Sequence, residues 1–78
     1  MAHRLQLSHR EMQIRHLEQA ERHVAQGERH IAEQEERVER LAGHGHNVIE
    51  ARKLLNNFYV SQTLLVQHRD QIRKELER

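Results

Sequence analysis

Histidines recur at intervals of seven residues in the first half of the chain, at His9, His16, His23 and His30. Imidazole nitrogens bind zinc, copper or haem iron when several of them converge. On a helix, a step of seven residues is two turns, or about 10.5 Å, so members of this series cannot share one ion. The sequence also has no His-x-x-x-His or Glu-x-x-His pair, which are the spacings of intrahelical metal ligands. A metal site therefore requires a histidine from a second helix.

The second half of the chain can supply that ligand at one point. If the chain folds back on itself at residues 44 and 45, an antiparallel register sets His23 opposite His68, and a dimer would double this pair. We expect no cofactor, because these imidazoles are expected to be solvated and only to cover the edge of the helix pair. The alternative is that His23 and His68 are metal ligands, with zinc or haem as the cofactor.

An arginine precedes three of these histidines, which predicts a cationic band along one side of a first helix. The band consists of Arg15, Arg22, Arg29, His16, His23 and His30. Such a band could bind the phosphates of nucleic acid, an anionic membrane surface or an acidic protein. The formal net charge is only +1 and no aromatic side chain lies on this side, so we do not expect nucleic acid as the main partner. The alternative is a solvated helix exterior with ion pairs four residues apart, such as Glu11–Arg15, Glu18–Arg22 and Glu33–Arg37.

Residues suited to catalysis are scarce. The chain has no cysteine and no glycine-rich phosphate loop, and its two serines, Ser8 and Ser61, are explained as a helix cap and a helix residue. A two-helix hairpin also has no obvious concave pocket. We therefore do not expect an enzyme.

Composition and capping signals predict the elements that position these residues. The 78 residues include no proline, only three glycines and 32% charged residues, which favours long solvated helices. Ser8 with Glu11, and Asn47 with Glu50, have the spacing of capping boxes at helix starts. Gly43 is expected to close the first helix.

These signals divide the chain 1–78 into a single helical hairpin. We predict a helix at about 9–42, a turn at 43–47 and a second helix at about 48–77. A link this short makes the two helices antiparallel neighbours. The predicted fold class is therefore all-α, an antiparallel hairpin with coiled-coil-like packing.

A heptad pattern defines the seam between the helices. The a and d positions of the first helix are Leu17, Ala20, Val24, Gly27, Ile31, Gln34, Val38 and Leu41, and those of the second are Val48, Ala51, Leu55, Phe58, Gln62, Leu65, Arg69, Ile72 and Leu76. Folding back at residues 44 and 45 sets Gly27 opposite Gln62. Because glycine costs a helix interior about 1 kcal/mol relative to alanine, we expect a close approach of the helices there. The alternative is that Gly27 only weakens an exposed turn.

The second helix carries more apolar surface than one partner helix can cover. The side chains expected to form an interface are Leu54, Phe58, Tyr59, Val60, Leu64, Leu65 and Val66. A chain this short, without disulfides, buries little apolar surface on its own. We therefore expect a homodimer in which two hairpins form a four-helix bundle. No segment has the length and hydropathy of a membrane span or a secretory signal, so we expect a soluble, cytoplasmic protein.

Several segments share motifs with one group of proteins. They are ERHVAQGERHIA at 21–32, GH at 45–46, ARKLL at 51–55 and HRD at 68–70. Through these motifs, residues 14–76 resemble short hypothetical helical-hairpin proteins of soil alphaproteobacteria. The resemblance implies a bacterial cytoplasmic hairpin and carries over no functional residues. We interpret the chain as a self-associating helical scaffold or regulator acting through protein contacts, with a histidine-dependent metal or haem bundle and a polyanion binder as the alternatives.

Overall fold

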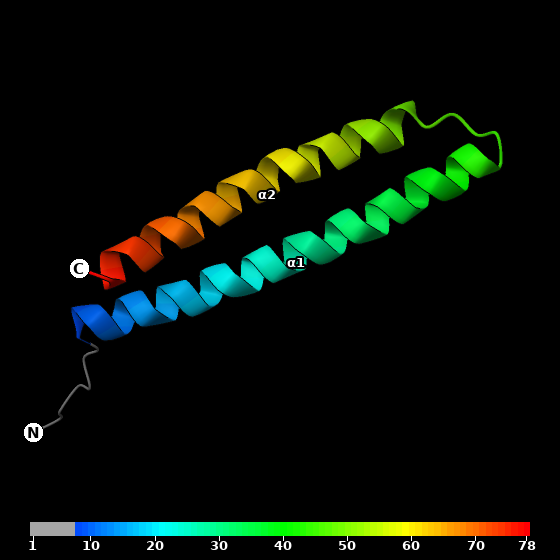
Figure 1. Ribbon diagram of the computed structural model, residues 1–78. Coiled ribbons are helices and arrows are strands. Elements are labelled where there is room, and N and C mark those ends of the chain that lie inside the picture. Colours follow the sequence, from blue (N-terminus) through cyan, green and yellow to red (C-terminus); the bar gives the residue numbers. More distant parts are fainter. Residues whose placement is uncertain (1–7) are drawn as a thin grey trace, which may run out of the picture.

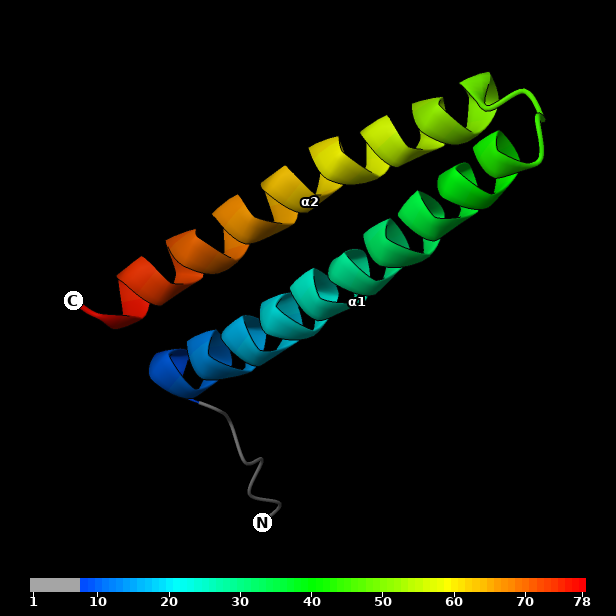
Figure 2. The same cartoon turned by 45° about the vertical axis from the view of Figure 1, so that its right-hand side comes forward.

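The computed structural model describes residues 8–78, which form two antiparallel α-helices joined by a short turn (Figure 1). Helix α1 spans His9–Gly43 (35 residues) and α2 spans Ile49–Leu76 (28 residues). The helices remain side by side when the molecule is turned by 45° (Figure 2). The described part of the chain contains no β-strand. The predicted all-α antiparallel hairpin is therefore confirmed.

Ser8 caps the first helix. Its Oγ accepts a hydrogen bond from the Glu11 N–H at 3.1 Å, and its hydroxyl donates to the Glu11 carboxylate at 3.1 Å. The first bond satisfies one of the N–H groups that a helix start leaves without a partner. The second holds a negative charge in the first turn, where the helix dipole favours it. The predicted pairing of Ser8 with Glu11 is confirmed.

Gly45, and not Gly43, reverses the chain after α1. The φ angle of Gly45 is 72°, in the left-handed region that glycine adopts without steric strain. Its N–H donates to the Ala42 carbonyl at 3.1 Å, and the His46 N–H donates to the Leu41 carbonyl at 2.9 Å. These bonds satisfy two of the last carbonyl groups of the helix. α1 thus ends at Gly43, as predicted, but the left-handed residue of the turn is Gly45.

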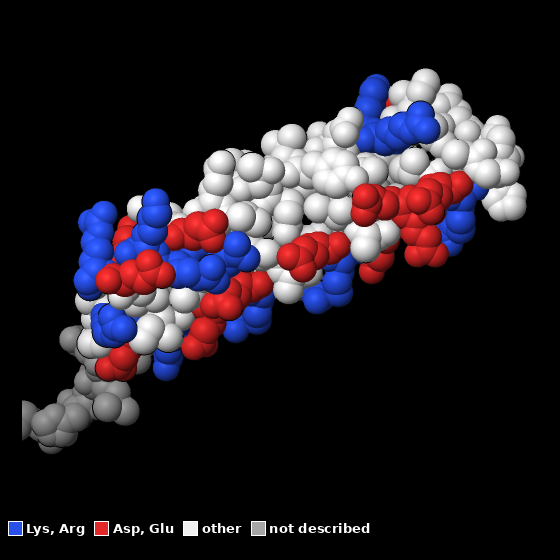
Figure 3. Space-filling model, viewed as in Figure 1, with Lys and Arg blue, Asp and Glu red and all other residues white. Residues whose placement is uncertain are grey.

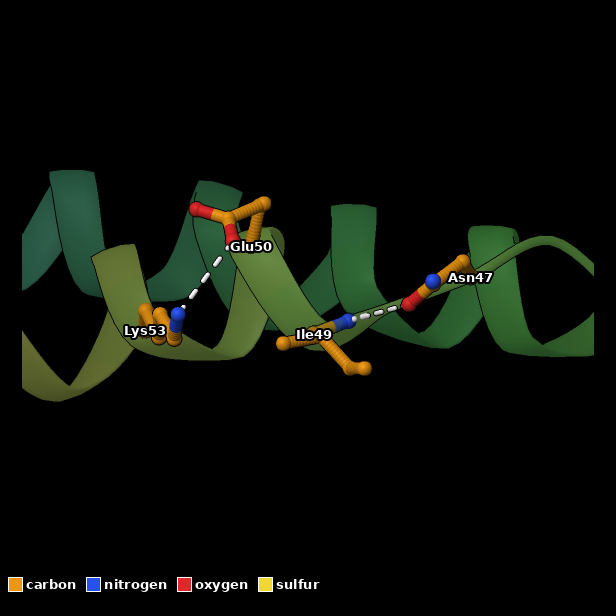
Figure 4. Close-up of polar contacts among 4 residues, drawn as sticks. All are labelled: Asn47, Ile49, Glu50 and Lys53. Carbon is orange, nitrogen blue, oxygen red and sulfur yellow. Dashed lines mark hydrogen bonds and ion pairs between the residues drawn. The ribbon is translucent and has the colours of Figure 1, made fainter.

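The predicted capping box at Asn47 and Glu50 is also wrong. The N-cap of α2 is Val48, whose side chain makes no capping bond. The Asn47 Oδ1 accepts a hydrogen bond from the Ile49 N–H at 2.9 Å, which is the bond of a turn and not of an N-cap (Figure 4). The Glu50 carboxylate lies 3.3 Å from Lys53 Nζ, on the same helix (Figure 4). The start of α2 is therefore held by an asparagine turn one residue before the cap.

The seam between α1 and α2 follows the heptad pattern. Every predicted a and d residue within 17–41 and 48–76 is buried or half-buried. The buried members are Ala20, Val24, Gln34 and Ile72. Apart from these a and d residues, the half-buried residues of the described chain are Gln13, Ala25 and Val66. The predicted sides of the two helices therefore face each other across the seam.

The seam buries few large apolar side chains. Among the described residues, the buried apolar side chains are Ala20, Val24 and Ile72, and none of them is fully buried. In contrast, the α2 side chains that are 41–63% exposed include Ile49, Leu54, Tyr59, Val60 and Leu64. Neither α1 nor α2 has the apolar stretch that a membrane crossing requires. Much of the large apolar surface of α2 therefore faces away from α1.

Candidate functional site

Two glutamine side chains join the helices across the seam. Gln34 Nε2 on α1 donates to the Ala51 carbonyl at 2.9 Å, and Gln62 Nε2 on α2 donates to the Val24 carbonyl at 2.9 Å. A helix carbonyl has a second lone pair that can accept such a bond without losing its helical bond. Each glutamine therefore ties its helix to one place on the other, and a shift of the register would break both bonds.

The helices approach closely where Gln62 meets Gly27. A Cβ added to Gly27 would overlap Gln62 Oε1 and would lie 2.8 Å from Gln62 Cδ. The Gln62 amide group therefore occupies the space that a side chain at position 27 would need. Its Oε1 is buried and has no hydrogen-bond partner among the described residues. The predicted close approach at Gly27 is confirmed, and it involves a side chain rather than two backbones.

The longest uncharged run of the described residues lies on α2. Residues 54–67 include no Lys, Arg, Asp or Glu, and Figure 3 shows this middle part of α2 as a white area between charged groups near both helix ends. The exposed fractions of Val60 and Leu64 are 63% and 61%. We define the outer face of α2 as the side that points away from α1. An uncharged face of this extent is typical of an interaction surface.

The seven predicted interface residues divide into two groups. Leu54, Tyr59, Val60 and Leu64 are exposed and free to meet another molecule. Phe58, Leu65 and Val66 are half-buried within the hairpin, and the ring centroid of Phe58 lies 6.1 Å from that of His30. Phe58 and Leu65 therefore belong mainly to the seam between α1 and α2.

A hydrogen bond that the sequence analysis did not predict links Tyr59 to α1. The Tyr59 hydroxyl donates to the Glu35 carboxylate at 2.8 Å. This bond raises the pKa of Tyr59, and desolvation and the negative charge of Glu35 act in the same direction. Both residues occupy the heptad position that follows d, which places them on the same edge of the seam. That shared position is the sequence signal that predicts such a contact.

The predicted metal ligands lie on the opposite edge of the seam. His23 and His68 line one surface depression, together with Ala20 and Ile72 of the seam. Both predicted ligands thus border the same depression. Within residues 8–78, no three His, Cys, Asp or Glu side chains are grouped so that they could hold a metal ion. Binding of zinc or haem by His23 and His68 stays a prediction.

Among the residues that the structure describes, the cationic band lacks the ion pairs that were expected beside it. All six of its residues are exposed on α1: Arg15, Arg22, Arg29, His16, His23 and His30. The ion pairs of the described residues all lie on α2, between Lys53 and Glu50 and between Asp70 and the arginines at 69 and 73. The predicted pairs Glu11–Arg15, Glu18–Arg22 and Glu33–Arg37 are therefore wrong. The three arginines of the band are left to solvent.

Comparisons with known proteins find no relative of this chain. No family model, curated protein or solved structure matches the chain. The resemblance to alphaproteobacterial hairpin proteins stays a prediction.

Proposed function

We propose that the protein is a small helical scaffold or regulator that acts through protein contacts and first associates with a second copy of itself. The observation that carries this proposal is the outer face of α2, where residues 54–67 have no charge and Val60 and Leu64 are more than 60% exposed. Two hairpins joined through this face would form an assembly of four helices.

The energy of such a contact suits a dimer of moderate affinity. Full burial of a valine or leucine side chain is worth roughly 1.5–3 kcal/mol. Because Val60 and Leu64 are 63% and 61% exposed, covering their exposed parts in both copies contributes on the order of 4–7 kcal/mol. Association costs at least about 4 kcal/mol in lost translational and rotational freedom. A dissociation constant of about 1 μM requires about 8 kcal/mol net, so neighbouring side chains such as Ile49 and Tyr59 must contribute at least as much as Val60 and Leu64.

Sedimentation equilibrium or light scattering across the micromolar range tests this proposal. The parent protein should show twice the mass of the chain, and Val60→Glu should shift it towards the monomer because it places a charge within the outer face. Met12→Glu is the matched control, since Met12 is also an exposed apolar residue (45%) but lies on α1. Circular dichroism at the same concentrations separates loss of the dimer from loss of the helices. A parent protein that stays monomeric at high micromolar concentration overturns the proposal.

A second candidate function is the binding of a polyanion. It is favoured by Arg15, Arg22 and Arg29, which are exposed and form no ion pair with another described residue. Binding of duplex DNA should be weak near neutral pH, should tighten as the adjacent histidines gain protons towards about pH 5.5, and should fall steeply with salt. Fluorescence anisotropy measures it, and changing all three arginines to glutamine should abolish it. If the affinity for DNA changes neither with salt nor in this triple variant, the cationic band is excluded as the binding surface.

A further inference from the structure

We propose that two copies of the chain pair through the outer face of α2 in antiparallel orientation, with Lys53 of each copy opposite Asp70 of the other. This inference rests on the proposed self-association and specifies its geometry. It places both α2 helices at the centre of the assembly and both α1 helices outside.

A second heptad stripe runs along the outer face of α2. Its residues recur at spacings of four and three, which is the spacing of a and d residues in a coiled coil. They are Ile49, Lys53, Asn56, Val60, Thr63, Gln67, Asp70 and Lys74, and all of them are exposed. Ile49 and Val60 are its apolar members, and Leu64 lies beside the stripe, next to Thr63. The Thr63 hydroxyl donates to the Tyr59 carbonyl at 3.1 Å, within its own helix. Thr63 can therefore be covered by a second copy without leaving its donor unpaired.

Charge determines the orientation of the two copies. The uncharged stretch 54–67 lies between the cation of Lys53 and the anion of Asp70 on this stripe. A parallel pair would set each of these charges beside the same charge of the second copy. An antiparallel pair with two-fold symmetry brings Lys53 to Asp70 at both ends of the contact. Like charges in contact are unfavourable and opposite charges fix the register, so the antiparallel arrangement is favoured.

The same stripe determines the register. When Lys53 meets Asp70, Val60 lies opposite Thr63 and Asn56 lies opposite Gln67, so that uncharged residues face one another along the whole stretch. A shift of one heptad in one direction would set Val60 against the Asp70 carboxylate. A shift in the other direction would leave Lys53 opposite Thr63. Only the proposed register joins both charges and covers Val60 with an uncharged residue.

The side chains of Lys53 and Asp70 are both free to pair with a second copy. The side chains of Lys53 and its neighbour Glu50 are 67% and 87% exposed, and their ion pair of 3.3 Å lies within one helix (Figure 4). The Asp70 side chain is 51% exposed, and its carboxylate forms ion pairs with the guanidinium groups of Arg69 at 3.0 Å and Arg73 at 3.9 Å. Exposed pairs of this kind contribute little to stability, so Lys53 can turn to a second copy with little loss.

A charge exchange tests the geometry. Lys53→Glu sets two carboxylates together at each end of the contact, and Asp70→Lys sets two ammonium groups together. Each single variant should raise the Kd of the homodimer by about tenfold. An equimolar mixture of the two variants restores both opposite-charge pairs in the heterodimer, whose Kd should return to within about threefold of the parent value. Sedimentation equilibrium measures all four samples, with circular dichroism to confirm that each remains helical.

Matched controls and outcomes make the result decisive. Arg22→Glu and Glu39→Lys change the net charge by the same amounts on exposed positions of α1 and should leave the Kd of the dimer unchanged. If the parent protein dimerises but the mixture binds no better than the single variants, the proposed register is overturned while self-association stands. If the parent protein is monomeric, both proposals are overturned.

Discussion

The contact between Gly27 and Gln62 leads to a quantitative prediction about the seam. In a helix interior, Gly→Ala ordinarily stabilises the fold by about 1 kcal/mol. At position 27, however, the new methyl group would overlap Gln62 Oε1 and lie 2.8 Å from Gln62 Cδ. The glutamine is flexible enough to move away, but it would then lose its 2.9 Å hydrogen bond to the Val24 carbonyl.

The two effects of Gly27→Ala nearly cancel. A net intramolecular hydrogen bond is worth about 0.5–1.5 kcal/mol, so its loss offsets the gain in helix propensity. We therefore expect Gly27→Ala to change the free energy of unfolding by less than about 0.5 kcal/mol in the parent protein. In a Gln62→Ala background the methyl group meets no amide, and the same substitution should stabilise the hairpin by about 1 kcal/mol.

Urea unfolding followed by circular dichroism measures this double-mutant cycle. All four proteins must be compared at one concentration, because self-association adds to the measured stability. The expected coupling free energy between positions 27 and 62 is about 0.5–1.5 kcal/mol. Gly43→Ala is a control, since a Cβ at that helical position would meet nothing within 4 Å. Equal stabilisation by Gly27→Ala in both backgrounds refutes the idea that Gln62 is held against Gly27.

Three further predictions concern single side chains. Ser8→Ala removes the N-cap acceptor and should lower the free energy of unfolding by about 1 kcal/mol in urea titrations, and an unchanged value contradicts the capping role. Tyr59 is the only tyrosine of the chain, and the hydrogen bond to Glu35 raises the pKa of its hydroxyl. The stabilisation from this bond is therefore present below pH about 10 and disappears as the pH rises through the folded-state pKa of Tyr59. Ultraviolet absorbance titration should show a lower pKa in Glu35→Gln, and an identical pKa in that variant excludes Glu35 as the cause. Gln34→Leu removes the hydrogen bond to the Ala51 carbonyl but places an apolar group in the seam. The melting temperature of this variant should therefore equal or exceed that of the parent protein. A large decrease would mean that the Gln34 amide itself stabilises the hairpin.

The seam was predictable from the sequence because burial in a two-helix hairpin depends mainly on which side of its helix a residue occupies. A heptad pattern reports that side directly, and the short turn at 43–47 fixes which residues face each other. The pairing of Gly27 with Gln62 followed from these two facts alone. The direction of the Gln62 side chain did not, because several rotamers fit the same backbone position.

Helix ends and exposed ion pairs were less predictable. At the start of α2, the Asn47 side chain can bond either as an N-cap or as a turn, and small backbone differences decide between them. At the end of α1, Gly43 and Gly45 both have the composition of a helix stop, and only the backbone angle distinguishes them. Exposed Arg and Glu side chains have many conformations of similar energy, so a spacing of four residues did not ensure a pair such as Glu18–Arg22.

The distribution of side chains between seam and surface is the strongest reason to regard the hairpin as half of an assembly. The seam contains Gly27, Gln34 and Gln62, which specify the register but contribute little hydrophobic burial, while Val60 and Leu64 lie outside it. On α1 no uncharged run is longer than 23–27, counting histidine as neutral, whereas α2 remains uncharged over 54–67. A hairpin that needed no partner would gain solubility from charges on that face, as α1 does on its exposed side. Covering the outer face of α2 with the same face of a second copy supplies the burial that the seam lacks, which means that the stability of the helices should rise with protein concentration.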